Sequence, residues 1–483
     1  MPLPEHAMFA PSHRIHFIGI GGIGMSGIAE ILLTMGYAVS GSDLRASATT
    51  ERLQRLGATI YIGHAAENAR ACDVVVTSTA VARDNLEILE ARARKTPVIP
   101  RAEMLAELMR LKYGIAVAGM HGKTTTTSMI AAVLAGGGLD PTVVVGGRVD
   151  AMGSNARLGR SQYLVAEADE SDRSFLKLSP VLAVVTNLDR EHMDTYRDME
   201  DVEDVFVEFM DKLPFYGAVT ACVDDARLRA VLPRVSRRVY LYGEREGADF
   251  QLRPMAANAG CHASFEVDAH GLLLGPFDLH VPGRHNLLNA TAAVSIGIQL
   301  GIAPEAIAEA LRSFRGVDRR FQTKGNARGV TVVDDYGHHP TEIKATLQAA
   351  RECGYGRVLV LFQPHRFTRT RDLMGEFAGA FGDADALEVL DIYAASEEPI
   401  AGVTGEALAR AIRGGVLNRG AAVEYAASVE EAVGRLVAMA RSGDMILTLG
   451  AGNVSQAGPL ILESCQAPKP PKSNKTKRKI AAH

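Results

Sequence analysis

The chain has 483 residues, of which 47% are hydrophobic and 22% charged, a composition typical of a folded globular protein and not of a disordered or fibrous one. Its five cysteines show no C-x-x-C spacing, which argues against a thiolate zinc site, and its net charge of -4 gives no general attraction for nucleic acid. No apolar run approaches the ~20 residues of a membrane-spanning helix, and the first residues do not resemble a secretory signal. We therefore expect a cytoplasmic protein of about three domains that binds neither nucleic acid nor membrane.

The first part of the chain alternates apolar strands with helical segments. An apolar run over 14–24 ends in a glycine cluster and leads into a helical pattern over 25–35, and further strands are expected at 37–43, 72–81 and 96–100. This alternation predicts a parallel sheet with crossover helices. We assign it to a first domain over residues 1–108.

The glycine cluster of this domain has the spacing of a nucleotide-binding turn. Gly19, Gly21 and Gly24 form G-x-G-x-x-G between strand and helix, and Asp43 ends the next strand about twenty residues later. Glycines allow the backbone to approach a pyrophosphate, to which the helix N-terminus presents its N–H groups. The motif fits NAD, FAD or another nucleotide diphosphate, and a packing turn without a ligand remains an alternative.

A second domain is expected over 109–316, where an apolar strand leads into a second glycine-bounded turn. Gly119, Gly122, Lys123 and Thr124 form G-x-x-G-K-T, which is shorter than the usual phosphate-loop pattern because Val117 stands in place of its first glycine. The parts that bind a triphosphate are present: backbone N–H groups, a lysine and a hydroxyl for Mg²⁺. The alternative is a glycine-rich loop with an incidental lysine.

Acidic residues follow the next strand of this domain, expected over 161–169. Glu167, Asp169, Glu170 and Asp172 would repel one another unless a cation neutralised some of them, so they favour a metal site over a solvated acidic turn. His192 follows the strand over 181–189, where either a structural or a ligand role is open. Short alternating strands are expected between 238 and 282, followed by a helix over 283–301.

A third domain is expected over 317–465, with strands over 329–340, 357–366, 386–396 and 444–453. Polar side chains follow two of these strands: Asp334, Asp335, Tyr336, His338 and His339 at the first, and Gln363, His365, Arg366 and Arg369 at the second. Two arginines at a strand end can bind a carboxylate in a bidentate manner. The basic, proline-containing segment over 466–483 is predicted to be a disordered tail.

Taken together and in order, these motifs resemble the ATP-dependent Mur ligases of peptidoglycan synthesis. The resemblance runs from Ile15 to Val454 and rests on GIGGIGMSGIAE, SGSD, AGMHGKTTTT, EADESD, EHMDTY, GRHNLLNATAA, GVDRRF, DDYGHHPTE, FQPHRFTRTRD, DIYAASEEPI and GAGN. It implies an α/β fold of three domains: an N-terminal Rossmann-like domain, a central P-loop ATPase-like domain and a C-terminal Rossmann-like domain. It is most similar to the members that join L-alanine to UDP-N-acetylmuramate through an acyl phosphate, using ATP with Mg²⁺ or Mn²⁺.

The resemblance also implies a role for particular residues. The UDP-sugar would contact Gly19, Gly21, Gly22, Gly24, Ser42, Asp43, His64 and Ser78. ATP would contact Gly119, Gly122, Lys123, Thr124, Thr125, Asn286, Asn289, Arg320 and Asp335, with Thr124, Glu167 and His192 as metal ligands. L-Alanine would contact Tyr336, His338, Arg366 and Arg369. Lys123 would be catalytic, and either His192 or His338 would accept the proton of the amine.

The sequence departs from the family pattern at two positions. Met120 stands where the family loop usually has Thr, and Glu191 stands before His192 where Asp is common. Backbone N–H groups bind the phosphates, so the change at Met120 should be tolerated.

The alternative functions are those of a murein peptide ligase, which would join a recycled tripeptide to the same UDP-sugar, and of an NAD-dependent oxidoreductase. We expect a monomer or a homodimer.

Overall fold

The computed structural model describes residues 12–78, 80–149, 154–255, 261–415 and 422–466. The chain divides into two compact units, Met1–Asp318 and Arg319–His483. Within the described residues, the first unit contains a five-stranded and a ten-stranded sheet, and the second unit contains a six-stranded sheet.

The five-stranded sheet is parallel throughout and has the strand order β3-β2-β1-β4-β5. Its strands are β1 (Arg14–Ile18), β2 (Ala38–Asp43), β3 (Thr59–Ile62), β4 (Val74–Thr77) and β5 (Val98–Pro100). Helices α1 (Ile23–Thr34), α2 (Ala48–Arg55), η1 (Ala66–Ala69), α3 (Leu86–Ala93) and α4 (Arg101–Arg110) connect them. β1 is the central strand, so the glycine-rich turn that follows it lies where ligands of parallel sheets bind.

The ten-stranded sheet has the order β15-β14-β13-β12-β11-β10-β6-β9-β7-β8. Its strands are β6 (Tyr113–Ala118), β7 (Thr142–Val149), β8 (Ser154–Arg157), β9 (Tyr163–Glu167), β10 (Leu182–Val185), β11 (Ala218–Cys222), β12 (Arg238–Gly243), β13 (Phe250–Pro254), β14 (Ala263–Ala269) and β15 (Leu272–Leu279). β6, β9 and β10 are parallel neighbours, so the phosphate loop, the acidic segment and the His192 loop leave the same edge.

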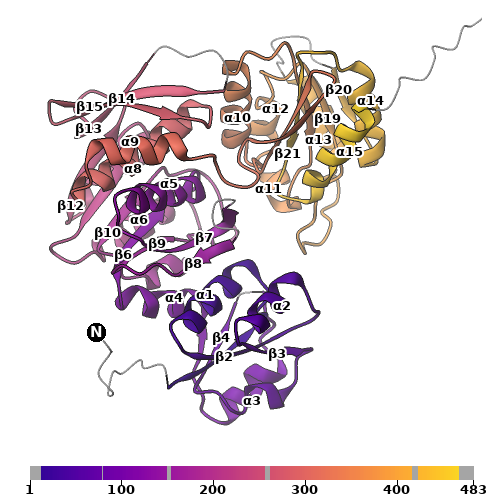
Figure 1. The fold of residues 1–483 in the computed structure, drawn as a ribbon. Helices are drawn as coiled ribbons and strands as arrows, with labels where there is room; N and C mark the ends of the chain where they lie inside the picture. The colour runs from indigo at the N-terminus through magenta and orange to yellow at the C-terminus, as the bar shows by residue number, and fades with distance from the viewer. Residues whose placement is uncertain (1–11, 79, 150–153, 256–260, 416–421, 467–483) are drawn as a thin grey trace, which may run out of the picture. The chain divides into compact units, whose positions relative to one another are not determined.

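Helices cover this second sheet and connect its strands (Figure 1). They are α5 (Lys123–Gly136), η2 (Ser174–Lys177), α6 (Met199–Asp211), α7 (Ala226–Val231), η3 (Leu232–Arg234), α8 (Arg284–Gln299) and α9 (Pro304–Ser313). α5 begins directly after the phosphate loop and packs against α8 and α9. The core includes a stack of Phe175 on Phe209, with ring centroids 4.8 Å apart, which holds η2 against α6.

The six-stranded sheet of the second unit has the order β16-β17-β21-β18-β19-β20, and all its neighbours are parallel except β16 and β17. Its strands are β16 (Gln322–Ala327), β17 (Val330–Asp335), β18 (Val358–Phe362), β19 (Ala386–Val389), β20 (Ala422–Tyr425) and β21 (Met445–Leu449). Its helices are α10 (Pro340–Glu352), α11 (Phe367–Asp372), α12 (Met374–Ala378), α13 (Gly405–Gly414), α14 (Val429–Met439), η4 (Asn453–Gln456) and α15 (Ala457–Gln466).

Both faces of this third sheet are buried, which explains its continuous apolar strands. Val333 and Val360 pack into one cluster, whereas the alternating neighbours Val332 and Leu361 pack into another on the opposite face. The two clusters together remove most of the strand surface from water, and this burial supplies the main driving force for the fold of the unit.

The predicted fold class is confirmed: the protein is α/β, with three sheets in the predicted order. The short strands expected between 238 and 282 are β12 to β15. Of the predicted tail over 466–483, residues 467–483 lie outside the described residues.

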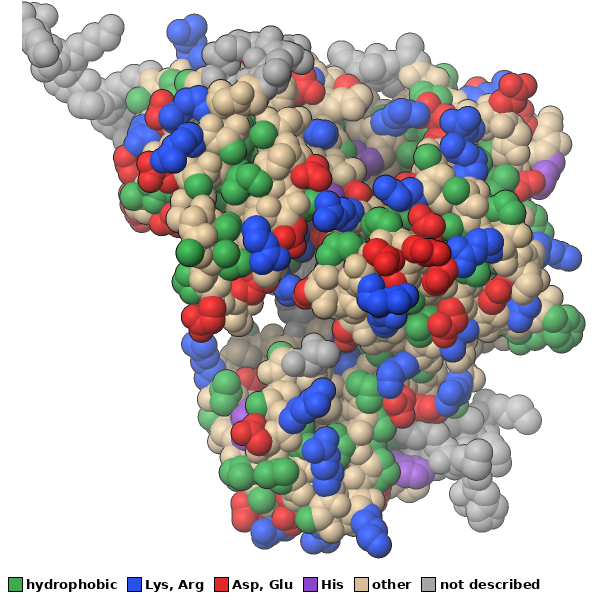
Figure 2. Space-filling model, turned by 180° about the vertical axis from the view of Figure 1, so that it is seen from behind, with side chains coloured by type: hydrophobic (Ala, Val, Ile, Leu, Met, Phe, Trp, Pro, Cys, Tyr) green, Lys and Arg blue, Asp and Glu red, His purple; other side chains and the backbone are tan. Residues whose placement is uncertain are grey.

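No described helix has the length and apolar character to cross a membrane. Figure 2 shows basic and acidic side chains interspersed on the face it presents.

Candidate functional site

The phosphate loop connects β6 to α5 and is shaped by two glycines with positive φ. Gly119 has φ of 132° and Gly122, which caps α5, has φ of 82°. A Cβ on Gly122 would lie 2.8 Å from Oδ1 of Asn289, and a Cβ on Gly119 would collide with the side chain of Thr186. Both positions therefore require glycine for space as well as for conformation.

Lys123 folds back over this loop and uses its three ammonium protons. Its Nζ donates to the carbonyls of Gly119 (2.7 Å) and Met120 (3.1 Å) and to Oε1 of Glu170 (2.8 Å). Burial by itself would lower the pKa of Lys123, but the negative charges of Glu170 and Glu167 outweigh it and raise the pKa above its usual value. Lys123 therefore stays charged, as an electrostatic contact to phosphate requires.

The acidic segment after β9 supplies two carboxylates to this region. Oε2 of Glu167 accepts a hydrogen bond from Oγ1 of Thr124 at 2.9 Å. The side chain of Glu170 is 1% exposed, and its Oε2 has no hydrogen-bond partner among the described residues. A buried carboxylate oxygen without a partner is costly, so this oxygen is available to a cation. Asp172, by contrast, is exposed at the surface.

His192 lies in the loop after β10 and faces the same carboxylate. Its Nε2 is 3.5 Å from Oε1 of Glu170, and its backbone has φ of 57°, a conformation uncommon for a residue with a side chain. The structure thus brings Lys123, Glu170 and His192 together, and separately pairs Thr124 with Glu167. Glu170 belongs to the acidic cluster recognised in the sequence, but only its burial distinguishes it from its neighbours.

His121 is a second loop residue in this site, and sequence reasoning did not select it. Its Nε2 is 2.8 Å from Oδ2 of Asp189, while its backbone N–H donates to Oδ1 of Asn187 and its carbonyl accepts from Nδ2 of the same residue. These contacts tie the phosphate loop to the loop after β10. The sequence feature that could have indicated the role of His121 is the pair Asn187 and Asp189, which follows an apolar strand.

Asn286 and Asn289 lie buried on the first turns of α8, beside the phosphate loop. Nδ2 of Asn289 donates to Oδ1 of Asn286, whose own Nδ2 donates to the carbonyl of Pro282. Since Asn289 also faces the Cα of Gly122, α8 supports the loop directly. Thr125, the last of the predicted ATP contacts in this unit, is buried on α5.

At the edge of the first sheet, the glycine-rich turn is held by Asp43. The backbone N–H of Gly21 donates to Oδ2 of Asp43 at 2.9 Å, and a Cβ on Gly21 would lie 2.8 Å from that oxygen. Gly19 has φ of 74°, and Gly22 caps α1. Ser78 follows β4 at the same edge, which is where parallel sheets bind ligands.

Glu87, which the sequence analysis did not select, organises two of the other predicted UDP-sugar contacts. Its fully buried carboxylate accepts from Oγ of Ser42 (2.6 Å) and Nδ2 of Asn68 (2.6 Å), and it lies 3.3 Å from Nδ1 of His64. Burial would raise the pKa of Glu87, but the neighbouring His16 and the hydrogen bonds from Ser42 and Asn68 outweigh it and lower the pKa to about 2.

The charge of Glu87 fixes the direction of the hydrogen bonds around it. An ionised carboxylate only accepts, so Ser42 donates to Glu87, and Nδ1 of His64, 3.0 Å from Oγ of Ser42, is the donor to that hydroxyl. Glu87 therefore fixes the orientation of the Ser42 and His64 side chains.

In the second unit, Asp335 ends β17, and its carboxylate is hydrogen-bonded to two backbone N–H groups and one hydroxyl. It accepts from the N–H groups of Phe321 (2.7 Å) and Gly337 (2.8 Å) and from Oγ1 of Thr346. Burial raises its pKa, against the positive charge of Arg320. Arg320 itself lies over the ring of Tyr336, 5.2 Å from its centroid.

Three of the predicted alanine contacts, Tyr336, His338 and Arg369, are linked in this unit through the ring of His338 and through His365. The rings of Tyr336 and His338 are 5.4 Å apart, and those of His338 and His365 are 5.5 Å apart. Arg369 donates to the carbonyl of His365 at 3.1 Å, and Arg366 has φ of 72°. A non-glycine residue held at positive φ is a strained position of the kind that clusters at functional sites.

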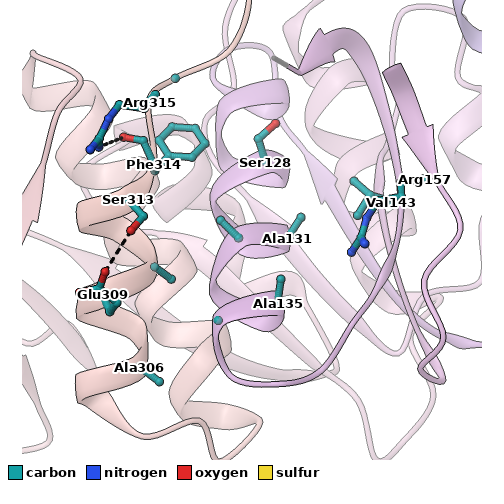
Figure 3. A pocket seen from close by; sticks show the side chains of 14 residues that line it. Ser128, Ala131, Ala135, Val143, Arg157, Ala306, Glu309, Ser313, Phe314 and Arg315 are labelled. Atoms are coloured by element: carbon teal, nitrogen blue, oxygen red, sulfur yellow. Dashed lines mark hydrogen bonds between the residues drawn. The ribbon is translucent and has the colours of Figure 1, made fainter. Parts of the chain in front are cut away.

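A separate cavity of about 580 Å³ lies beside α5, between this helix, α9 and the β7–β8 hairpin (Figure 3). The small side chains of Ala131, Ala135 and Ala306 leave the cavity unfilled. Glu309, at the rim, accepts a hydrogen bond from the hydroxyl of Ser313. Its lining holds none of the predicted site residues, so we do not assign it to the reaction.

Comparisons with known proteins cover the chain almost from end to end. The model for the Mur ligase family, catalytic domain, matches residues 14–113; the Mur ligase middle domain matches 117–297; and the Mur ligase, glutamate ligase domain matches 319–452. The UDP-N-acetylmuramate–L-alanine ligase of Acidobacterium capsulatum is 65% identical over 460 residues, which cover 95% of this chain and 99% of that protein.

Solved structures agree with this result. The crystal structure of the UDP-N-acetylmuramate–alanine ligase from Thermotoga maritima is 30% identical, has a TM-score of 0.75, and covers 94% of this chain and 99% of its own. A murein peptide ligase from Psychrobacter arcticus is 23% identical with a TM-score of 0.65, covers 94% of this chain and 99% of its own, and shows similarity of fold alone.

Proposed function

Because the chain belongs to the Mur ligase family, we propose that it joins the amine of L-alanine to the lactyl carboxylate of UDP-N-acetylmuramate, with consumption of ATP, in peptidoglycan precursor synthesis. The observation that carries this proposal is the 65% identity, over 95% of the chain, to a ligase of that activity. The likeness to a murein peptide ligase is far weaker, so alanine is favoured over a tripeptide as the acceptor.

The first step activates the carboxylate. A carboxylate is a poor electrophile, so the γ-phosphoryl group of ATP is transferred to it and an acyl phosphate forms. Lys123 stabilises the charge that spreads over the transferring group, and the backbone N–H groups at the start of α5 hold the remaining phosphates. For this, Lys123 must exchange at least one of its three present acceptors for a phosphate oxygen.

The residues around Lys123 fit a divalent cation. Thr124 offers a hydroxyl, Glu167 and Glu170 offer carboxylates, and the buried Oε2 of Glu170 has no hydrogen-bond partner among the described residues. Oxygen donors of this kind suit Mg²⁺, while the imidazole of His192 also suits Mn²⁺. When bound, the ion would neutralise charge on the phosphates and position them.

The second step forms the amide. Arg366 and Arg369 bind the α-carboxylate of L-alanine, beside Tyr336 and His338. The amine attacks the acyl carbonyl, the tetrahedral intermediate collapses, and phosphate leaves. The amine loses one proton, for which His192 and His338 are the two candidates. A single chain matches all three family models, so one chain, alone or in a homodimer, would carry out the complete reaction. We place this reaction in the cytoplasm.

The test is the identity of the product. Purified protein is given UDP-N-acetylmuramate, ATP and Mg²⁺ with single amino acids or with tripeptide, and product masses and phosphate release are recorded. We expect a UDP-N-acetylmuramoyl-alanine product, with phosphate release that requires both the UDP-sugar and alanine. Preference for the tripeptide would make the protein a murein peptide ligase. Tight binding of NAD or NADP without UDP-sugar binding would support an oxidoreductase.

A further inference from the structure

One arginine contacts both the glycine-rich turn of the first sheet and the acidic segment of the second. Arg101 is the first residue of α4, directly after β5. A Cβ on Gly24 would lie 2.6 Å from Nη1 and 3.0 Å from Cδ of Arg101, so the arginine packs on the bare Cα of Gly24. Its Nη2 donates to Oδ2 of Asp169 at 3.1 Å.

Both contacts of Arg101 belong to regions of the proposed reaction. Gly24 is the third glycine of the G-x-G-x-x-G turn, on the first turn of α1. Asp169 lies between Glu167, which is bound to Thr124, and Glu170, which is bound to Lys123. The guanidinium therefore connects the N-terminus of α1 to the segment that supplies carboxylates to the phosphate loop.

Arg101 keeps unused hydrogen-bonding capacity. A guanidinium has five N–H donors, and among the described residues Asp169 is its only hydrogen-bond partner. Its side chain is 27% exposed, so water and anions reach it. Oδ1 of Asp169 accepts from the backbone N–H and the hydroxyl of Ser171, which leaves its Oδ2 to Arg101.

We propose that Arg101 is a positioning residue that couples occupancy of the UDP-sugar site to occupancy of the ATP site. The inference rests on the proposed function, which puts a pyrophosphate at the glycine-rich turn. The pyrophosphate draws the guanidinium toward the start of α1 and weakens its hold on Asp169. As the positive charge of Arg101 moves away, the net charge of the region beside Lys123 becomes more negative. This favours binding of the divalent cation that accompanies ATP.

The nature of the contact explains why an arginine and a glycine occur together here. Arginine presents several donors in one plane, so its guanidinium can take up a phosphate oxygen while its contact with the carboxylate weakens, whereas lysine acts as a single point charge. A side chain at position 24 would push the guanidinium away from the turn. Gly24 thus serves the approach of Arg101 as well as that of the ligand.

The test compares two affinities rather than two rates. The dissociation constant of a non-hydrolysable ATP analogue with Mg²⁺ is measured by calorimetry in the absence and presence of saturating UDP-N-acetylmuramate. In the wild type we expect the UDP-sugar to tighten analogue binding by ~5–10-fold, within the usual range for coupled sites. Arg101→Ala should reduce this ratio to less than about 2-fold, and Arg101→Lys should leave an intermediate ratio.

Two further variants complete the design. Asp169→Asn breaks the same contact from the other end and should also remove the coupling, even if Arg101→Ala binds the UDP-sugar too weakly to be measured. Arg110→Ala, an exposed residue of the same helix paired with Glu107, should keep the wild-type ratio. A wild-type ratio of one, or an unchanged ratio in Asp169→Asn, overturns the role of Arg101. A wild type that does not bind the UDP-sugar contradicts the proposed function instead.

Discussion

Two buried glutamates at the edges of neighbouring sheets are held in opposite ways. Glu87, in the first sheet, receives hydrogen bonds from neutral donors on both oxygens and has two histidines beside it. Glu170, in the second, pairs one oxygen with the ammonium of Lys123 and leaves the other without a partner among the described residues. Both oxygens of the Glu87 carboxylate are already hydrogen-bonded, and we call this the closed site. One oxygen of the Glu170 carboxylate lacks a hydrogen-bond partner among the described residues, and we call this the open site.

The difference separates a carboxylate that orients its neighbours from one that we propose takes part in binding. Removing the charge of Glu87 disturbs the side chains it orients, Ser42 and His64, but affects no lysine or arginine hydrogen bond. Removing the charge of Glu170 leaves Lys123 without its counter-charge and removes an oxygen available to a metal ion. Effects at the Glu170 site should therefore appear in the chemistry, and effects at Glu87 in stability and UDP-sugar binding.

The largest effect is expected at the open site. Lys123→Ala should lower kcat by at least ~10²-fold, the scale of a lost preorganised electrostatic contact. The same change leaves Glu170 buried and unpaired, so the melting temperature should also fall. The double variant Lys123→Ala/Glu170→Gln should recover the melting temperature but not kcat. Near-normal kcat in Lys123→Ala would contradict the phosphate-loop assignment, and Lys177→Ala, at an exposed pair with Glu103, is the control.

A second large effect is expected in the second unit, where Arg366 and Arg369 are proposed to bind the carboxylate of L-alanine. Arg366→Ala should raise the KM for L-alanine by ~10–100-fold, since a carboxylate without its guanidinium partner loses a charge-assisted contact; Arg369→Ala should have a smaller effect. The KM values for ATP and the UDP-sugar should change little. Steady-state kinetics with each substrate varied in turn check this, and Arg371→Ala, paired with Asp372, is the control. Equal weakening of all three substrates would mean that these arginines are structural.

A smaller effect should distinguish the carboxylates that bind a metal from those that do not. Glu167→Gln and Glu170→Gln should each raise the Mg²⁺ concentration for half activity by ~10-fold, and His192→Ala should raise it as well. Mn²⁺ should partly rescue Glu167→Gln, because it accepts the remaining imidazole ligand more readily. Direct titration of Mn²⁺ binding with the ATP analogue provides a readout independent of turnover. Asp172→Asn, at an exposed residue of the same segment, should leave the metal dependence unchanged.

The smallest effect concerns the pH dependence of stability at the closed site. The pKa of Glu87 is lowered from 4.5 to about 2 in the folded protein, so the unfolded chain binds the proton more readily. The stabilisation is complete above the unfolded pKa and is lost as the pH falls toward about 2; at pH 3.5 the loss is about 1 kcal/mol. Glu87→Gln should remove this part of the pH dependence in melting curves recorded between pH 7 and 3.5. Glu90→Gln, on the same helix, should behave as wild type.

The sequence was sufficient where a structural feature depends on residues that are close together in the chain. The phosphate loop, the acidic segment and the strand ends of the third sheet could be recognised because a strand, a turn and a helix place consecutive residues at one edge. The α/β class followed from the same alternation, because buried parallel strands need long apolar runs.

The sequence was not sufficient where a side chain acts through burial. Glu87 lies 45 positions from Ser42 in the chain, and nothing around it forms a motif. Glu170 was visible in the acidic cluster, but four neighbouring carboxylates cannot be ranked without knowing which one is buried against Lys123. Arg101 follows a proline at an ordinary helix start, so the sequence does not distinguish it. Only its contacts with Gly24 and Asp169 show that it lies between the proposed ligand-binding edges of the two sheets.

The three acceptors of Lys123 also determine how the ATP-free protein responds to small anions. A lysine whose protons are already shared among two carbonyls and a carboxylate attracts free phosphate or sulfate weakly, since such an anion must displace one of these acceptors and approach a site that carries negative charge. Only a nucleotide that brings its own cation and its own adenosine contacts can compensate for that displacement. We therefore expect the released phosphate to be a poor product inhibitor, so the ligase can keep working in a cell rich in inorganic phosphate.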